Sequence, residues 1–140
     1  MERNYILSKL VFIDDDPLTN QFHKMLIESM KVAREIECFD SAESILAHYS
    51  KTNPNRKFPD LFCVDIGLPK MNGHELAVAL RQLPEFKEQK STICFLTGSK
   101  DINDVIAADV NQFNHYFWKP LDKPKFNTLL KEVYNFSFGR

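Results

Sequence analysis

Short apolar runs alternate along this chain with longer segments in which apolar residues recur at helical spacing. The runs are too short for core helices and are rich in branched and aromatic residues, which favours buried strands. We expect such strands at 9–13, 61–64, 93–96 and 113–118, and a weak alternation over 33–39 predicts one more. Because strands that alternate with helices pair in parallel through right-handed crossovers, the pattern predicts a parallel sheet with helices on both faces.

The segments between the strands carry helix signals. Pro17 opens the first, whose predicted inward face consists of Phe22, Met25, Leu26, Ser29 and Met30. The second begins at a cap formed by Asp40 or Ser41 and reaches Tyr49. Further helices are expected over 75–83, 101–110 and 122–136, with Pro84 disturbing or ending the first of these.

Length and charge fit one domain that acts through protein contacts. The 140 residues are 44% hydrophobic and carry a net charge of −1, which argues against a nucleic-acid binder or a membrane-surface protein. No apolar run approaches the roughly 20 residues that span a bilayer, and the amino terminus lacks a signal-peptide core. The three cysteines form no CxxC pair, so we expect reduced, buried thiols in a cytoplasmic protein.

Polar side chains follow four of the predicted strands at the point where each strand ends. Three acids, residues 14–16, follow the first strand, and Asp65, Thr97 and Lys119 follow the third, fourth and fifth. In a parallel sheet all of them meet at the carboxyl edge, where chemistry collects. Gathered carboxylates without His or Cys favour Mg²⁺, and a lysine with a hydroxyl beside the metal suits a phosphoryl group. An aspartate can itself accept phosphoryl as an acyl phosphate.

This set of motifs resembles the receiver domain of response regulators in two-component signalling. The resemblance covers roughly residues 8–135. It rests on an acidic pair, a phosphorylation loop with proline four and glycine eight residues after the aspartate, a switch hydroxyl before a small residue, and a Lys-Pro pair. These motifs occupy residues 11–17, 64–73, 95–98 and 117–120.

The resemblance implies a role for each matching residue. Asp65 is the expected phosphoacceptor, with Thr97 bonding a phosphoryl oxygen and Lys119 pairing with it. Asp14, Asp15 and Asp65 are expected to hold Mg²⁺ together with the backbone carbonyl of Gly67. Thr97 and Tyr116 are the expected switch pair, and Tyr116 as plain packing stays open. The peptide bond before Pro120 is usually cis in this family.

The resemblance also implies a fold and a function. The expected fold is flavodoxin-like α/β, a doubly wound five-stranded parallel sheet of order 2-1-3-4-5 with five helices. One receiver domain is expected over 1–140, stand-alone, cytoplasmic, and monomeric or weakly dimeric. The expected partners are a sensor histidine kinase or phosphotransfer protein and an unidentified downstream protein, without nucleic acid or membrane. Such a domain catalyses only its own phosphorylation and dephosphorylation and is not otherwise an enzyme.

Three alternatives stay open. The first is a receiver cut from a hybrid histidine kinase or longer regulator, and the second is a receiver-like module without phosphorylation. The third is a phosphatase of the haloacid dehalogenase type. The phosphatase motif makes Asp14 the nucleophile, but it needs Thr or Val where Leu18 stands. Asp16 either caps the first helix or contacts the metal. Gly67 stands where the family often has a bulkier residue, and Ser99 flanks the same predicted water path.

Overall fold

The computed structural model describes residues 5–51, 53–98 and 115–134. Five strands form a single parallel sheet in the order β2-β1-β3-β4-β5, which confirms the predicted fold class. They are β1 (Leu7–Ile13), β2 (Ala33–Phe39), β3 (Leu61–Asp65), β4 (Thr92–Thr97) and β5 (His115–Trp118). The carboxyl ends of β1, β3, β4 and β5 therefore share one edge of the sheet.

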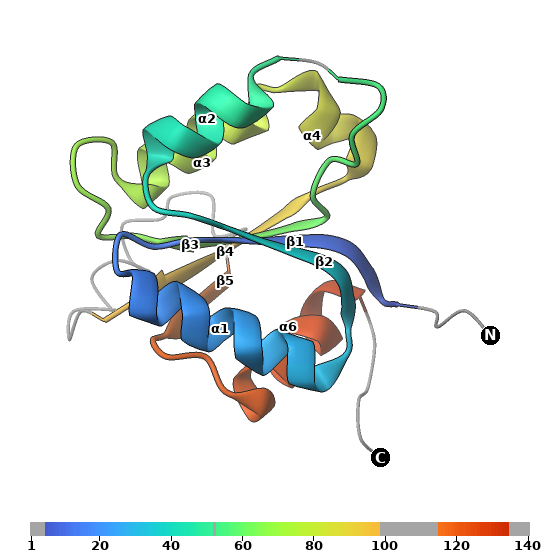
Figure 1. Cartoon of the computed structure of the whole chain (residues 1–140), viewed down its shortest axis with the longest axis vertical. Helices are drawn as coiled ribbons and strands as arrows, with labels where there is room; N and C mark the ends of the chain where they lie inside the picture. Colours follow the sequence, from blue (N-terminus) through green and yellow to red (C-terminus); the bar gives the residue numbers. More distant parts are fainter. Residues whose placement is uncertain (1–4, 52, 99–114, 135–140) are drawn as a thin grey trace.

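Helices cover both faces of the sheet. Figure 1 shows α2, α3 and α4 over one face and α1 and α6 over the other. Their bounds are α1 (Pro17–Met30), α2 (Ala42–Tyr49), α3 (Gly73–Arg81), α4 (Pro84–Gln89) and α6 (Lys123–Tyr134). The sequence did not predict α4: Pro84 occupies its first turn, a position that tolerates proline because no N–H bond is lost there. The predicted helix over 101–110 lies outside the described residues.

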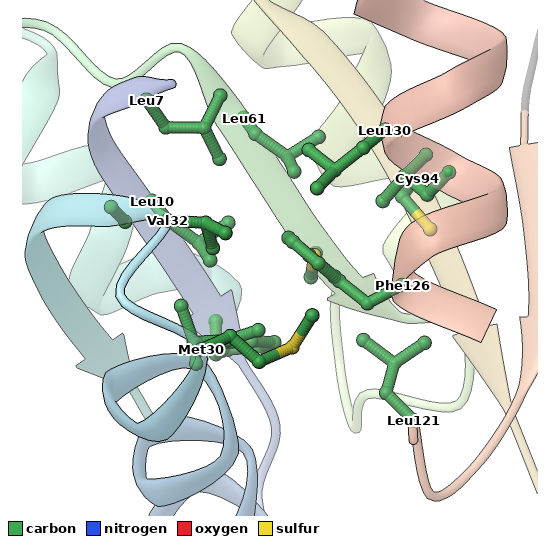
Figure 2. Packing of buried hydrophobic residues seen from close by; sticks show 14 of the residues in the cluster. Leu7, Leu10, Met30, Val32, Leu61, Cys94, Leu121, Phe126 and Leu130 are labelled. Carbon is green, nitrogen blue, oxygen red and sulfur yellow. The ribbon is translucent and has the colours of Figure 1, made fainter. Parts of the chain in front are cut away.

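Two apolar clusters form the core, one on each face of the sheet. Alternation along β1 sends Leu10 and Phe12 into the cluster beneath α1 and α6, and Val11 and Ile13 into the cluster beneath α2 and α3. Figure 2 shows the first cluster, where Phe126 of α6 lies close to Leu121 and Met30. Burial on both faces fixes the register of the strands, and so fixes where their last residues lie.

The predicted inward face of α1 is confirmed at Met30 but wrong at Phe22, Met25 and Ser29. Its buried residues are Asn20, His23, Ile27 and Met30, whereas Phe22 and Met25 are 50% and 61% exposed. The reason is that Asn20 and His23 find hydrogen-bond partners inside the protein. Their polar side chains can therefore lie on the buried face of the helix, and this turns Phe22 and Met25 toward the exposed face.

The cysteines also differ in part from the prediction. Cys63 and Cys94 are buried and unbridged, but Cys38 on the edge strand β2 is exposed. Among the described helices, none is long and apolar enough to cross a membrane.

Candidate functional site

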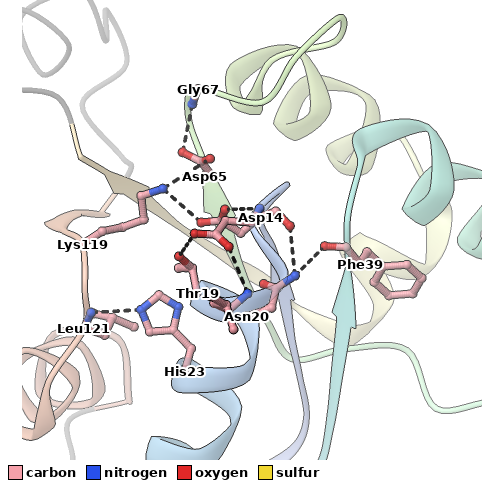
Figure 3. Close-up of polar contacts among 11 residues, drawn as sticks. Asp14, Thr19, Asn20, His23, Phe39, Asp65, Gly67, Lys119 and Leu121 are labelled. Atoms are coloured by element: carbon pink, nitrogen blue, oxygen red, sulfur yellow. Dashed lines mark hydrogen bonds and ion pairs between the residues drawn. The ribbon is translucent and has the colours of Figure 1, made fainter.

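Three aspartates come together at the carboxyl edge of the sheet. Asp14 and Asp15 follow β1 and Asp65 ends β3, and one carboxylate oxygen of each lies within 4.8 Å of the others. Asp14 and Asp65 are buried, whereas Asp15 is exposed. Figure 3 shows Asp14 and Asp65 facing one another above the amino-terminal end of α1.

Hydrogen bonds to the backbone hold Asp14 in place. Its N–H donates to the carbonyl of Phe39 at 3.1 Å, which ties the end of β1 to β2. The Nδ2 group of Asn20 donates to the carbonyls of both Asp14 and Phe39 at 3.0 Å. Asn20 thus stabilises the turn from β1 into α1. Sequence reasoning missed this residue because its partner on β2 is distant along the chain.

Asp16 caps α1, which confirms the capping interpretation of the third acid. Its Oδ1 accepts from the N–H of Leu18 and its Oδ2 accepts from the hydroxyl of Thr19, each at 3.0 Å. These hydrogen bonds lower the pKa of the Asp16 carboxyl. A carboxylate at this position also interacts favourably with the helix dipole.

Lys119 places its ammonium group between two of the aspartates. Its Nζ lies 3.0 Å from Oδ2 of Asp14 and 3.4 Å from Oδ2 of Asp65. Its backbone N–H donates to the carbonyl of Thr97 at 2.8 Å, so β4 fixes the start of the loop after β5. Burial disfavours the charged lysine, but the hydrogen bond to Asp14 and the charges of both aspartates outweigh it and raise its pKa.

At Asp65 the balance of these effects disfavours the charged form. Burial raises the pKa of its carboxyl and the charge of Asp14 adds to the effect, against a hydrogen bond from Gly67 and the charge of Lys119. The N–H of Gly67 donates to Oδ1 at 3.0 Å. A charged Asp65 is therefore held at a cost to stability, which is typical of functional carboxylates.

The loop that begins at Gly67 returns to the sheet at Gly73. The N–H of Gly73 donates to the carbonyl of Ile66 at 3.0 Å. A Cβ atom at Gly73 would lie 2.5 Å from the backbone oxygen of Asp65, so only glycine fits. Asn72 and Glu75 then form a capping box at the start of α3.

The predicted switch residues lie on the neighbouring strands β4 and β5. Thr97 is buried at the end of β4, next to Trp118 on β5. Tyr116 stacks on Phe95 with ring centroids 5.3 Å apart, and its hydroxyl lies 3.3 Å from Nε2 of His74 on α3. Sequence reasoning missed His74, because nothing in its local pattern indicates contact with β5.

The donor set fits a small, hard cation. Three carboxylates converge, and Lys119 is the one lysine that pairs with them among the interactions described for residues 5–51, 53–98 and 115–134. Oxygen ligands without nitrogen or sulfur suit Mg²⁺. The carbonyl of Gly67 as a further ligand stays a prediction. The bond between Lys119 and Pro120 is cis, as the resemblance implies.

Comparison with known proteins shows a match to a sequence family and to individual relatives. A sequence model of the response regulator receiver domain matches residues 10–131. The chain is 33% identical to regulatory protein VanRB of Enterococcus faecalis over 89% of its length. It is 30% identical to hybrid signal transduction histidine kinase C of Dictyostelium discoideum over 68% of its length.

A solved structure is similar over nearly the whole chain. The two-component response regulator of Cytophaga hutchinsonii has 27% identity and a TM-score of 0.78, and the match covers 93% of this chain and 98% of that one. The chain spans 49% of the length of VanRB and 7% of the length of the Dictyostelium kinase.

Proposed function

The chain belongs to the response regulator receiver domain family, and on this premise we propose that Asp65 accepts a phosphoryl group from a phosphohistidine. The donor is a sensor histidine kinase or a phosphotransfer protein. A carboxylate oxygen of Asp65 forms a bond to phosphorus while the phosphorus–nitrogen bond of the donor breaks, and the donor imidazole keeps that electron pair. Water later attacks the acyl phosphate and releases inorganic phosphate.

The observation that carries this proposal is the position of Lys119 beside both Asp14 and Asp65. An ammonium group 3.4 Å from Oδ2 of Asp65 can also pair with phosphoryl oxygens on that carboxylate. Charge that develops on the transferring group is then met by a group already in place, which lowers the barrier without reorganisation. The buried hydroxyl of Thr97 would donate to a second phosphoryl oxygen.

Asp14, Asp15 and Asp65 would hold Mg²⁺, together with the carbonyl of Gly67. When bound, the ion neutralises the carboxylates and the incoming phosphoryl oxygens. The exposed position of Asp15 leaves it accessible to a cation from solvent. Lys119 pairs with both Asp14 and Asp65 in the folded domain.

We propose that Thr97 and Tyr116 transmit the modification to the surface. Thr97 would move toward the phosphoryl group, and Tyr116 would turn inward into the space that this movement opens. Tyr116 begins from a defined position, stacked on Phe95 and bonded to His74. The changed surface would then bind a downstream protein, and the charge balance of the chain gives no reason to expect nucleic acid or membrane.

The phosphodonor would dock on the exposed side of α1. Leu18 and Phe22 are 73% and 50% exposed, and with Lys119 and Pro120 they line a pocket of about 340 Å³. This apolar surface lies beside the proposed phosphoacceptor, so a protein bound there would bring its phosphohistidine close to Asp65. We expect Phe22→Ala to slow phosphotransfer from a protein donor but not labelling by acetyl phosphate. Equal slowing with both donors would contradict this docking site.

Within the family, residues 1–140 would form one receiver domain that acts in the cytoplasm as a monomer or weak dimer, either alone or as part of a longer protein. It would catalyse only its own phosphorylation and dephosphorylation. The match to a hybrid kinase is consistent with the second arrangement, in which the chain is a module of a longer protein. The full-length reading frame distinguishes the two.

Labelling tests the proposed function against its rivals. We expect acetyl phosphate with Mg²⁺ to modify Asp65, located by mass spectrometry after reduction of the acyl phosphate. Label on Asp14 would instead support the phosphatase of the haloacid dehalogenase type. Beryllofluoride with Mg²⁺ should change the fluorescence of Trp118, the sole tryptophan, which lies next to Lys119. The absence of binding by direct calorimetry would revive the module without phosphorylation.

A further inference from the structure

His23 is a buried histidine that joins α1 to the loop carrying Lys119. Its side chain lies on the inner face of α1 and is 1% exposed. The ring stacks on Phe12 of β1 with centroids 5.1 Å apart and an interplanar angle of 21°. Its Nε2 accepts a hydrogen bond from the N–H of Leu121 at 3.0 Å, and Figure 3 shows this bond crossing from α1 to the loop.

The atom that His23 holds is close to Lys119 along the chain. Leu121 follows Lys119 by two residues, and its own side chain is fully buried in the cluster beneath α1. Other hydrogen bonds that hold this loop lie at different points. The N–H of Lys119 donates to Thr97, and the ammonium group of Lys125 donates to the carbonyls of Trp118 and Pro120 from an exposed position.

His23 can accept a hydrogen bond near neutral pH. Burial lowers its pKa to about 4, so the ring is neutral and Nε2 can accept the Leu121 N–H. A buried backbone N–H needs an acceptor, and a purely apolar side chain at position 23 provides none. Position 23 therefore requires a hydrogen-bond acceptor as well as a side chain of suitable volume.

We infer, on the basis of the proposed phosphoryl acceptance at Asp65, that His23 is a positioning residue that acts through Lys119. It would hold the backbone after β5 so that the ammonium group of Lys119 reaches Asp14 and Asp65 together. A small displacement of that group would weaken its contact with the transferring phosphoryl group, because the effect of a fixed charge depends on its exact placement.

Substitutions that separate packing from hydrogen bonding test this role. His23→Phe keeps a flat ring against Phe12 but lacks the acceptor, whereas Gln at this position carries an oxygen that can replace Nε2. We expect His23→Phe to slow acetyl phosphate labelling of Asp65 about 10-fold, with His23→Gln much closer to wild type. Ile27→Ala, a cavity variant in the same helix, serves as the control for lost stability. If His23→Phe fails to fold, His23→Leu takes its place.

A double variant decides whether His23 acts through Lys119. In a Lys119→Ala background, we expect His23→Phe to cause no further slowing. Equal slowing in both backgrounds, or slowing matched by an equally destabilised Ile27→Ala, would overturn the inference and leave His23 with packing alone. Unchanged labelling of His23→Phe would also overturn it. If the wild type itself is not labelled, the proposed function fails first, so the two failures are distinguishable.

Discussion

The Nζ atom of Lys119 lies 3.4 Å from Oδ2 of Asp65, although the two residues come from different strand ends. The same ammonium group contacts Asp14 more closely, at 3.0 Å. Lys119 is thus shared between the two buried carboxylates of the site. The charge of Lys119 opposes the rise in the pKa of Asp65 that burial causes.

Removal of the Lys119 ammonium group is expected to slow phosphorylation strongly. Lys119→Ala deletes a cation that faces the transferring oxygens, and loss of one such group typically costs about 100-fold in rate. The measurement is the rate of acetyl phosphate labelling with saturating Mg²⁺. Lys123→Ala, which changes an exposed lysine at the start of α6, is the matched control and should label at the wild-type rate.

Asp65→Asn is expected to stabilise the domain in the absence of Mg²⁺. The change removes a buried charge beside Asp14 and keeps an oxygen that can accept the Gly67 N–H. We predict a melting temperature a few degrees higher at pH 7, with the gain shrinking as pH falls and the wild-type carboxyl becomes protonated.

The contrast with a second aspartate makes this test specific. Asp60 accepts backbone N–H groups from Ser8 and Lys9 at the opposite edge of the sheet. Asp60→Asn should therefore destabilise, since an amide is a weaker acceptor than a carboxylate. A lower melting temperature for Asp65→Asn as well would argue against charge strain at the site.

His23 gives the fold a predicted dependence on pH. The ordinary pKa of histidine is 6.5, and burial lowers that of His23 to about 4, with Lys119 lowering it further and Asp14 opposing. Between these values the unfolded chain binds a proton that the folded chain does not, so stability falls as pH drops. The full loss is about 3 kcal/mol at pH 4.

Urea unfolding of wild type and His23→Gln from pH 7 to pH 4.5 isolates this contribution. As pH falls, the unfolding free energy of wild type should decrease relative to that of the variant. A difference that is constant with pH would show that His23 titrates alike in the folded and unfolded chains.

Gly67 is expected to control the lifetime of the acyl phosphate. A Cβ atom there would lie 3.7 Å from Oδ1 of Asp65, an ordinary contact, so a side chain fits without displacing the carboxylate. Gly67→Asn and Gly67→Met should shield the phosphorus from water and lengthen the lifetime several-fold. Decay of the labelled protein is the measurement, and unchanged decay in both variants would reject the prediction. Gly73→Ala, which has no such space, should instead destabilise the domain.

The features that the sequence predicted well are those set by local patterns. Each predicted strand has a counterpart, because runs of apolar residues that end in a polar one indicate buried strands of limited length. The meeting of Asp14, Asp15 and Asp65 followed from that pattern, since parallel strands end at one edge.

The features that were missed depend on contacts between distant residues. The inner face of α1 contains Asn20 and His23, whose partners lie on β2 and after β5. An apolar count cannot identify a buried polar side chain without its partner. The bond between His74 and Tyr116 has the same origin, because α3 and β5 meet only in the folded domain.

Phosphotransfer to wild type and to Asp65→Asn in parallel tests the role of Asp65 directly. Both proteins receive the same phosphohistidine donor or acetyl phosphate with Mg²⁺, and incorporated phosphoryl is quantified after confirming that each is folded. We predict acid-stable, base-labile label on the wild type, located at Asp65, and none above background on Asp65→Asn. Equal labelling of the two proteins would contradict the assignment of Asp65 as the phosphoacceptor.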